Sequence, residues 1–147
     1  MNKEEFMRGS LFPLGMEMKP FEKVIEGKMY ALPLLSEPMR ITNVVHEPKS
    51  RNHWHVHKAL EGGGQILIVL KGFGLYQEWQ KPARFLKPGD IVSIPPAIQH
   101  WHGASGDSWC EMITIQVPGR GLATEWGEPL SDDDYQKVID SLNVMQG

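Results

Sequence analysis

Two short stretches, HWHVH at residues 53–57 and HWH at residues 100–102, hold five of the six histidines of this chain. Side chains two positions apart on a β-strand point to the same face of the strand. His53, His55 and His57 therefore share a face if the first stretch is extended. The same holds for His100 and His102 in the second stretch. Two such strands can gather imidazoles around one metal ion, because imidazole is the commonest metal ligand among protein side chains.

Short apolar runs separated by turn signals fill the middle of the chain. The candidate strands lie at residues 29–35, 39–47, 65–70, 73–79, 83–86, 90–95 and 109–117. Breaks that contain Gly, Pro and Ser stand between them. This spacing predicts an all-β fold, a small sandwich or barrel of antiparallel strands.

A helical pattern is found near the C-terminus. Ser131 can cap a helix, and three aspartates follow it in the first turn, where the helix dipole favours negative charge. Apolar residues then recur on one face, namely Tyr135, Val138, Ile139 and Leu142. We expect a short amphipathic helix that packs on the outside of the barrel.

Composition narrows the class of protein. The chain has 147 residues, 41% of them hydrophobic, which is the size of one domain with its own core. The net charge is −3 with no basic block, so nucleic acid is not an expected partner. No apolar run approaches the ~20 residues that span a bilayer, so no membrane association is expected. The lone Cys110 and an N-terminus without a signal-peptide pattern predict a cytoplasmic protein.

The first histidine stretch resembles the first motif of the cupin superfamily, G-x5-H-x-H-x3,4-E-x6-G. His55 and His57 match its histidine pair, although His53 and His55 have the same spacing. Lys49 stands where the motif has its opening glycine.

The second stretch resembles the second cupin motif, G-x5-P-x-G-x2-H-x3-N. Gly89, Pro95 and His100 match it, whereas Ala97 replaces its second glycine. The resemblance spans about residues 40–117. It implies a double-stranded β-helix (jelly-roll) barrel that binds a divalent metal ion, with Mn, Fe, Ni and Zn as the candidates.

The fourth ligand has two candidates. Glu61 follows His57 after three residues, which is the usual gap, but Ile68 stands where the motif then requires a glycine. Gln65 meets that requirement, because Gly72 follows it after six residues. We therefore favour Gln65, at the start of the strand QILIVL, over Glu61, which precedes the run of three glycines at 62–64.

A subgroup resemblance rests on WHVH at 54–57, GGQILIVLKGFG at 63–74, KPGDIVSIPPAIQHWHGA at 87–104 and TEWGEPLSDDDY at 124–135. These stretches resemble small cupins that occur alone or beside carboxymuconolactone decarboxylase-like domains and that include manganese-dependent hydroxynitrile lyases. Those lyases bind the metal through three His and one Gln, which implies the ligand set His55, His57, Gln65 and His100 here, with His53 outside it. Their catalytic histidine on a late strand corresponds to Met112, and a thioether cannot transfer a proton. Gln116, four residues on, matches a pocket residue of the lyases.

The remaining histidines are candidates for a general base, which has to lie close to the metal. His102 lies two residues past His100 and is our candidate catalytic residue. The candidate substrate pocket is formed by residues of three segments, namely Thr42, Val44, His46, His53, Met112 and Gln116.

We expect the cupin barrel at residues 36–118, an N-terminal arm at 1–35 that can exchange a strand in a homodimer, and a C-terminal segment at 119–147 that carries the helix. The expected function is that of a metal-dependent lyase, isomerase or decarboxylase-like enzyme, with the metal as Lewis acid and a small oxygenated organic molecule as substrate. A dioxygenase that uses Fe, Ni or Mn is one alternative. A non-catalytic binding or sensor protein is the other, since Met112 replaces the lyase histidine.

Overall fold

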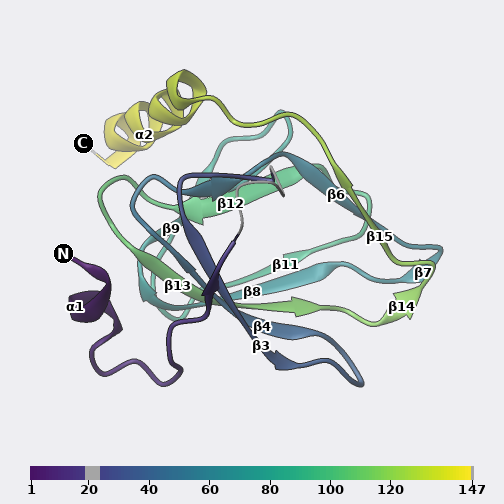
Figure 1. Cartoon of the computed structure of the whole chain (residues 1–147). Helices are drawn as coiled ribbons and strands as arrows, with labels where there is room; N and C mark the ends of the chain where they lie inside the picture. The colour runs from purple at the N-terminus through teal and green to yellow at the C-terminus, as the bar shows by residue number, and fades with distance from the viewer. Residues whose placement is uncertain (19–23, 147) are drawn as a thin grey trace.

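The computed structural model describes residues 1–18 and 24–146, with side chains up to residue 143. Two antiparallel sheets face each other and form a barrel (Figure 1). The seven predicted strand segments all coincide with strands of the structure, and the predicted all-β barrel of antiparallel strands with a short C-terminal helix is confirmed.

The first sheet has the strand order β1-β3-β4-β13-β8-β11 within the described residues. Its strands are β1 (Met16–Glu17), β3 (Met29–Leu35), β4 (Ile41–His46), β13 (Cys110–Gln116), β8 (Gln65–Gly72) and β11 (Ile91–Ile94). The register pairs Val44 of β4 with Met112 of β13, and Gln116 of β13 with Gln65 of β8.

The second sheet has the order β10-β9-β12-β5-β2, and β6 joins it between β12 and β15. Its strands are β10 (Arg84–Leu86), β9 (Gly74–Glu78), β12 (His100–Ala104), β5 (Arg51–Asn52), β2 (Ile25–Glu26), β6 (His55–Lys58) and β15 (Ala123–Trp126). A small separate ladder pairs β7 (Glu61–Gly62) with β14 (Gly119–Arg120).

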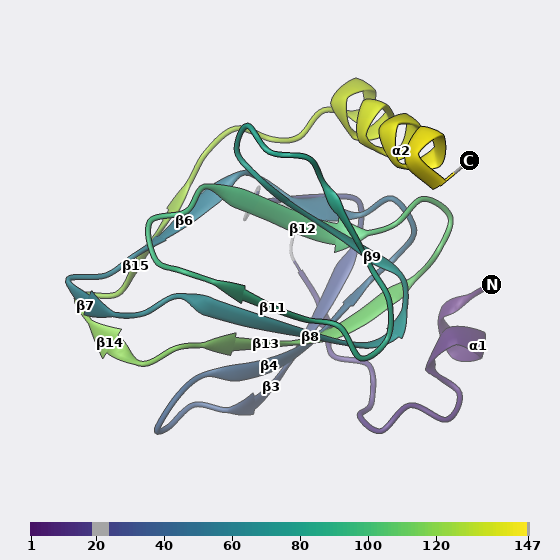
Figure 2. The same cartoon turned by 180° about the vertical axis from the view of Figure 1, so that it is seen from behind.

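Apolar side chains fill the space between the two sheets. Val44, Leu67 and Met112 of the first sheet meet Tyr76 and Ala104 of the second in one buried cluster. Burial of this apolar surface is the main favourable term that holds the two sheets together. β6 leads into β7 and β14 leads into β15, so these strands meet at the end of the barrel where β7 and β14 are found, here termed the open end (Figures 1 and 2).

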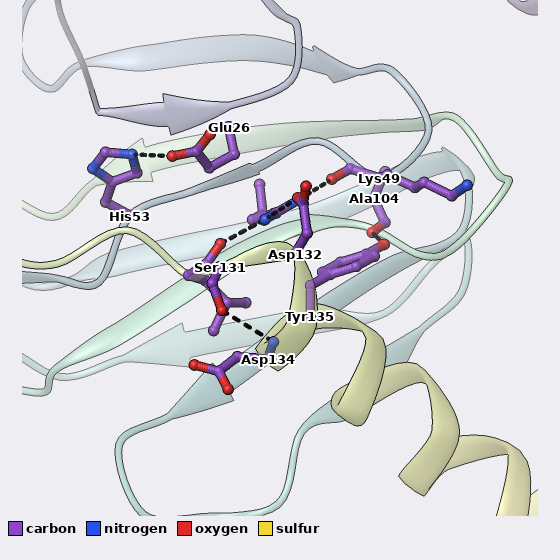
Figure 3. Close-up of polar contacts among 10 residues, drawn as sticks. Glu26, Lys49, His53, Ala104, Ser131, Asp132, Asp134 and Tyr135 are labelled. Carbon is purple, nitrogen blue, oxygen red and sulfur yellow. Dashed lines mark hydrogen bonds and ion pairs between the residues drawn. The ribbon is translucent and has the colours of Figure 1, made fainter.

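The C-terminal helix α2 (Asp132–Gln146) packs on the outer face of the second sheet. The Ser131 hydroxyl accepts a hydrogen bond from the backbone N–H of Asp134 (3.1 Å), so Ser131 caps the helix as predicted (Figure 3). The Tyr135 hydroxyl donates to the carbonyl of Ala104 (2.6 Å). The predicted apolar face is confirmed, because Tyr135, Val138 and Leu142 are buried and Ile139 is half-buried against them.

A buried arginine fastens the start of α2 to the barrel. Arg51 of β5 is 3% exposed. Its guanidinium donates to the carbonyl of Leu130 (3.1 and 2.6 Å) and to Asp132 (2.8 Å), and it lies over the ring of Tyr135. Because the charge has several acceptors, its burial is compensated.

The N-terminal arm packs against its own barrel. Helix α1 (Lys3–Met7) is capped by Asn2 and buries Phe6, which stacks on Trp109 (ring centroids 5.5 Å apart). β1 then pairs with β3. The helix lies at the end of the barrel opposite β7 and β14 (Figure 2).

Candidate metal centre

Three imidazoles converge inside the barrel. His55 and His57 come from β6, and His100 comes from β12, where it is the register partner of His55. One ring nitrogen of each lies within 4.8 Å of the others, which is a spacing that one metal ion can bridge. Within the described residues, this is the group of His, Cys, Asp and Glu side chains that could hold a metal ion.

Hydrogen bonds fix which nitrogen of two rings is available to a ligand. Nδ1 of His55 bonds to the carbonyl of His53 (2.7 Å), and Nδ1 of His100 bonds to the carbonyl of Ile98 (2.9 Å). A carbonyl can only accept, so each Nδ1 carries the proton and each Nε2 has a free lone pair. Nε2 of His100 is buried and has no protein partner among the described residues. Buried polar atoms in proteins are usually paired, so this nitrogen is available to a metal ion.

Burial keeps the three rings neutral. It lowers the pKa of His55 to about 3 and that of His100 to about 4, since desolvation penalises the charged form. Burial also lowers the pKa of His57. Neutral imidazoles are the form that binds metals, so the donor set fits a divalent ion.

Of the two candidates for a fourth ligand, the structure brings Gln65 to the cluster. Its Oε1 lies 3.0 Å from Nε2 of His57. Glu61 lies instead on the surface, in β7, where it forms an ion pair with Arg120 (3.0 Å). The three glycines after Glu61 have positive φ angles of 62°, 82° and 103°, which explains the choice of glycine at these positions.

At two positions where the cupin motifs have glycine, this chain has another residue, but the backbone keeps the conformation that glycine favours. Lys49 has φ 67° and Ala97 has φ 70°, both in the left-handed region. The backbone N–H of Ala97 donates to the carbonyl of His57 (2.9 Å), which ties the second motif to the first. The motif positions therefore keep their conformation while the residue types differ.

His102 lies deeper in the barrel than the three-histidine cluster. Its ring centroid is 6.0 Å from that of His55 and 6.3 Å from that of His100. Asn52 accepts from the backbone N–H of His102 (2.8 Å), which turns its Nδ2 toward Nε2 of the same residue (3.0 Å). Because an amide NH2 can only donate, Nε2 of His102 accepts and Nδ1 carries the proton.

His46 faces His102 from β4, with ring centroids 5.8 Å apart. It is fully buried, and neither of its nitrogens has a hydrogen-bond partner among the described residues. Burial lowers the pKa of His46 to about 4, so the ring is neutral at neutral pH. Burial also lowers the pKa of His102 well below its usual value.

His53 does not join the cluster. The condition for a shared face, that residues 53–57 form one extended strand, is not met, because β5 ends at Asn52 and β6 begins at His55. Between these strands the backbone changes its hydrogen-bond partners. The backbone N–H of His53 donates to the carbonyl of Val24, and that of Trp54 donates to the carbonyl of Glu128. The ring of His53 turns toward Glu26, with Nε2 3.3 Å from Oε1 (Figure 3).

The other predicted pocket residues lie at different depths. Val44 and Met112 are buried in the apolar core, and Thr42 is half-buried next to Thr114. Gln116 lies nearer the open end, where its amide donates to the carbonyl of Gly64 (2.9 Å) and its side chain lines a cavity of about 440 Å³.

Two residues of β15 contact the cluster and were missed by the sequence analysis. Thr124 and Trp126 are the register partners of His57 and His55. The hydroxyl of Thr124 lies 3.3 Å from Nδ1 of His57, and the ring of Trp126 lies 4.6 Å from that of His55. The segment TEWGEPL carried part of the family resemblance, but no spacing rule connects it with residues almost 70 positions earlier.

Comparisons with known proteins agree with this architecture. No family model matches the chain, and no curated protein does. Among solved structures, a cupin-like protein from Thermotoga maritima superposes with a TM-score of 0.78 at 36% sequence identity, covering 88% of this chain and 96% of that one.

Two further structures are similar in fold at lower identity. A cupin 2 conserved barrel domain protein from Rhodopseudomonas palustris has a TM-score of 0.63 at 13% identity, covering 90% of this chain and 88% of its own. A predicted oxalate decarboxylase from Thermotoga maritima has a TM-score of 0.62 at 19% identity, covering 75% of this chain and 96% of its own.

The fold and the cluster define a class: antiparallel double-sheet barrels with imidazoles gathered in the interior. The 36% identity over nearly the whole length of the first relative makes the assignment specific. The chain belongs to the cupin superfamily. None of the helices that the structure describes has the length and apolar character needed to cross a membrane.

Proposed function

We propose that this cupin is a metal-dependent enzyme of the lyase, isomerase or decarboxylase type, acting on a small oxygenated organic molecule. The observation that carries the proposal is the neutral three-histidine cluster with the buried, unpartnered Nε2 of His100. His55, His57, His100 and Gln65 would hold the ion. Bound there, a divalent ion supplies Lewis-acid chemistry, the polarisation of a carbonyl or hydroxyl oxygen.

The chain's own residues contribute orientation of the ligands and a hydrogen-bond donor. The carbonyls of His53 and Ile98 hold two imidazoles so that each Nε2 faces the centre. His102 presents Nδ1–H to the interior, because Asn52 occupies its other nitrogen. We propose His102 as the catalytic residue, which orients the substrate through a hydrogen bond from this N–H.

Some solved structures with this fold are named as decarboxylases or lyases, which supports a reaction of this type but does not assign one to this chain. Besides the predicted oxalate decarboxylase, a DMSP lyase from Ruegeria pomeroyi superposes with a TM-score of 0.56 at 18% identity, covering 85% of this chain and 60% of its own. Such identities establish the fold alone, and a fold hosts many reactions. The chemistry of the site therefore carries the proposal.

Metal content is the first test. We expect wild-type protein from a metal-replete host to carry about one Mn, Fe, Ni or Zn per chain by elemental analysis. Gln65→Ala should lose metal, since its Oε1 lies 3.0 Å from Nε2 of His57, whereas Glu61→Ala should keep it, since Glu61 is on the surface. The double variant His55→Ala/His100→Ala should lose metal and all turnover. A wild type that binds none of these metals rules out the proposal.

Two alternatives remain open to experiment. A dioxygenase that uses Fe, Ni or Mn would have the same ligands, and oxygen uptake with enolised or diol substrates separates it from the first proposal. A non-catalytic binding or sensor protein is favoured by Met112, which lies in the core where the lyases have a histidine. For that alternative we expect ligand binding without turnover. A cytoplasmic location and a homodimer that exchanges its arm also stand as proposals.

A further inference from the structure

A cavity of about 440 Å³ lies at the open end of the barrel, lined by residues that include Gly119 of β14 and Thr124 of β15. Two of its lining residues connect the cavity with the metal centre. Thr124 contacts His57, and Gln116 is the register partner of Gln65. A molecule in this cavity therefore contacts the residues that neighbour two of the four proposed ligands, His57 and Gln65. The volume suits a small organic molecule.

The alternation of side chains along β4 places the cationic residue Arg40 at this cavity. Val44 and His46 of β4 are buried on the inner face, and Thr42 continues that face toward the open end. Arg40 is the next residue in the same alternation, and its carbonyl accepts from the backbone N–H of Gln116 (2.9 Å), which extends the β4–β13 ladder. Arg40 lines the cavity together with Gln116.

The guanidinium of Arg40 has no ion pair or hydrogen bond to any residue that the structure describes. Nearby cations on this end are already neutralised, Arg120 by Glu61 and Lys58 by Glu125. Glu37 lines the same cavity but forms no ion pair with Arg40. Arg40 thus keeps all of its donors available, and a guanidinium is suited to two parallel hydrogen bonds with a carboxylate.

We propose that Arg40 binds the carboxylate of the substrate, so that the substrate class is a small carboxylic acid whose other oxygen faces the metal centre. The position of the other oxygen rests on the proposed function, whereas the carboxylate site at Arg40 rests on the cavity alone. Arg40 is a binding residue and takes no part in bond making. The charge of Glu37 opposes the anion and limits the affinity.

The test measures binding of simple probes by titration calorimetry at low ionic strength. The probes are acetate, glycolate, malonate and succinate, each compared with its neutral amide, on manganese-loaded protein with the metal content of each sample determined. The variants are Arg40→Gln, Glu37→Gln and Arg8→Gln. The last is a matched control with the same charge change, next to α1 at the other end of the barrel (Figure 1).

We expect Arg40→Gln to weaken binding of at least one carboxylate about tenfold to a hundredfold, with the neutral amides and the metal content unchanged. Arg8→Gln should bind as the wild type does, and Glu37→Gln should bind carboxylates more tightly. Equal carboxylate affinity in Arg40→Gln and wild type overturns the inference. So does an equal loss for the neutral amides, or a wild type that binds none of the four acids.

Failure of the proposed function gives a different result. If the wild type takes up no metal, the same titrations on metal-free protein still compare Arg40→Gln with Arg8→Gln. A selective loss of carboxylate binding then supports the Arg40 site although the enzyme proposal has failed.

Discussion

Ala97 and Lys49 hold the left-handed backbone conformation without being glycine. Such a residue pays a steric cost between its Cβ and the backbone, of about 1 kcal/mol. Ala97 lies three residues before His100 and is bonded to His57, so its cost falls beside the metal centre. Strained backbone at such positions persists when the surrounding structure determines it, as the hydrogen bond from Ala97 to His57 does here.

We expect Ala97→Gly to stabilise the protein by about 1 kcal/mol, because glycine adopts φ 70° without the Cβ cost. Urea denaturation measures the free energy of unfolding. Ala83→Gly is the control, since Ala83 does not have a positive φ, and it should destabilise by roughly 0.5–1 kcal/mol through backbone entropy. Destabilisation by Ala97→Gly would contradict the argument.

At this scale, sequence reasoning identified the right candidates for the cluster and misplaced one neighbour. His55, His57 and His100 are brought together, because the alternation of a strand and the spacing of the motifs are local properties. His53 has the same spacing, but its direction is decided by Val24 and Glu26, which are remote in sequence. Local periodicity cannot report where a strand changes its partner.

Among the elements, seven strands between residues 29 and 117 could be predicted, because each is bounded by turn residues and holds a run of apolar or alternating side chains. The histidine-bearing strands β6 and β12 were not among these seven. The two-residue strands β1, β2, β5, β7 and β14 could not, since they have no periodicity to detect. β15 has the burial pattern of an exposed segment, and its role follows only from its pairing with β6.

Trp126 is the residue of β15 that we expect to support metal binding. Its ring packs 4.6 Å from His55 and restricts the orientation of that imidazole. Replacement of groups that orient a metal ligand typically costs about tenfold or more in affinity. We therefore expect Trp126→Ala to weaken metal binding about tenfold, measured by competition with a chromophoric chelator.

Trp126→Phe is the matched variant, because it keeps an aromatic ring against His55 and should bind metal nearly as well as the wild type. Equal metal affinity in the wild type and Trp126→Ala would mean that His55 is held by its bond to the His53 carbonyl alone.

For the whole molecule, metal binding and folding should be linked. The four proposed ligands come from β6, β8 and β12, so an ion that holds them binds only the folded chain. At a free metal concentration 100 times the dissociation constant, the stabilisation is about 2.7 kcal/mol. For a domain of this size, we expect the chelator EDTA to lower the Tm by roughly 5–10 °C in a calorimetric scan.

The variant His55→Ala/His100→Ala is the control for this measurement. It lacks two ligands, so its Tm should be the same with and without EDTA. A Tm of the wild type that does not respond to metal would count against a bound ion in the folded state.

The pairing of β6 has a consequence for the order in which the molecule assembles. β6 shares one registered pair with β12, His55 with His100, but four with β15. During synthesis, residues 123–126 leave the ribosome after all the other strands that the structure describes. Until they do, the strand that bears His55 and His57 has most of one edge unpaired, while the rest of the barrel can already have formed. The metal centre would thus be among the last parts of this protein to mature, and a nascent chain stalled before residue 123 would have a barrel without a competent site.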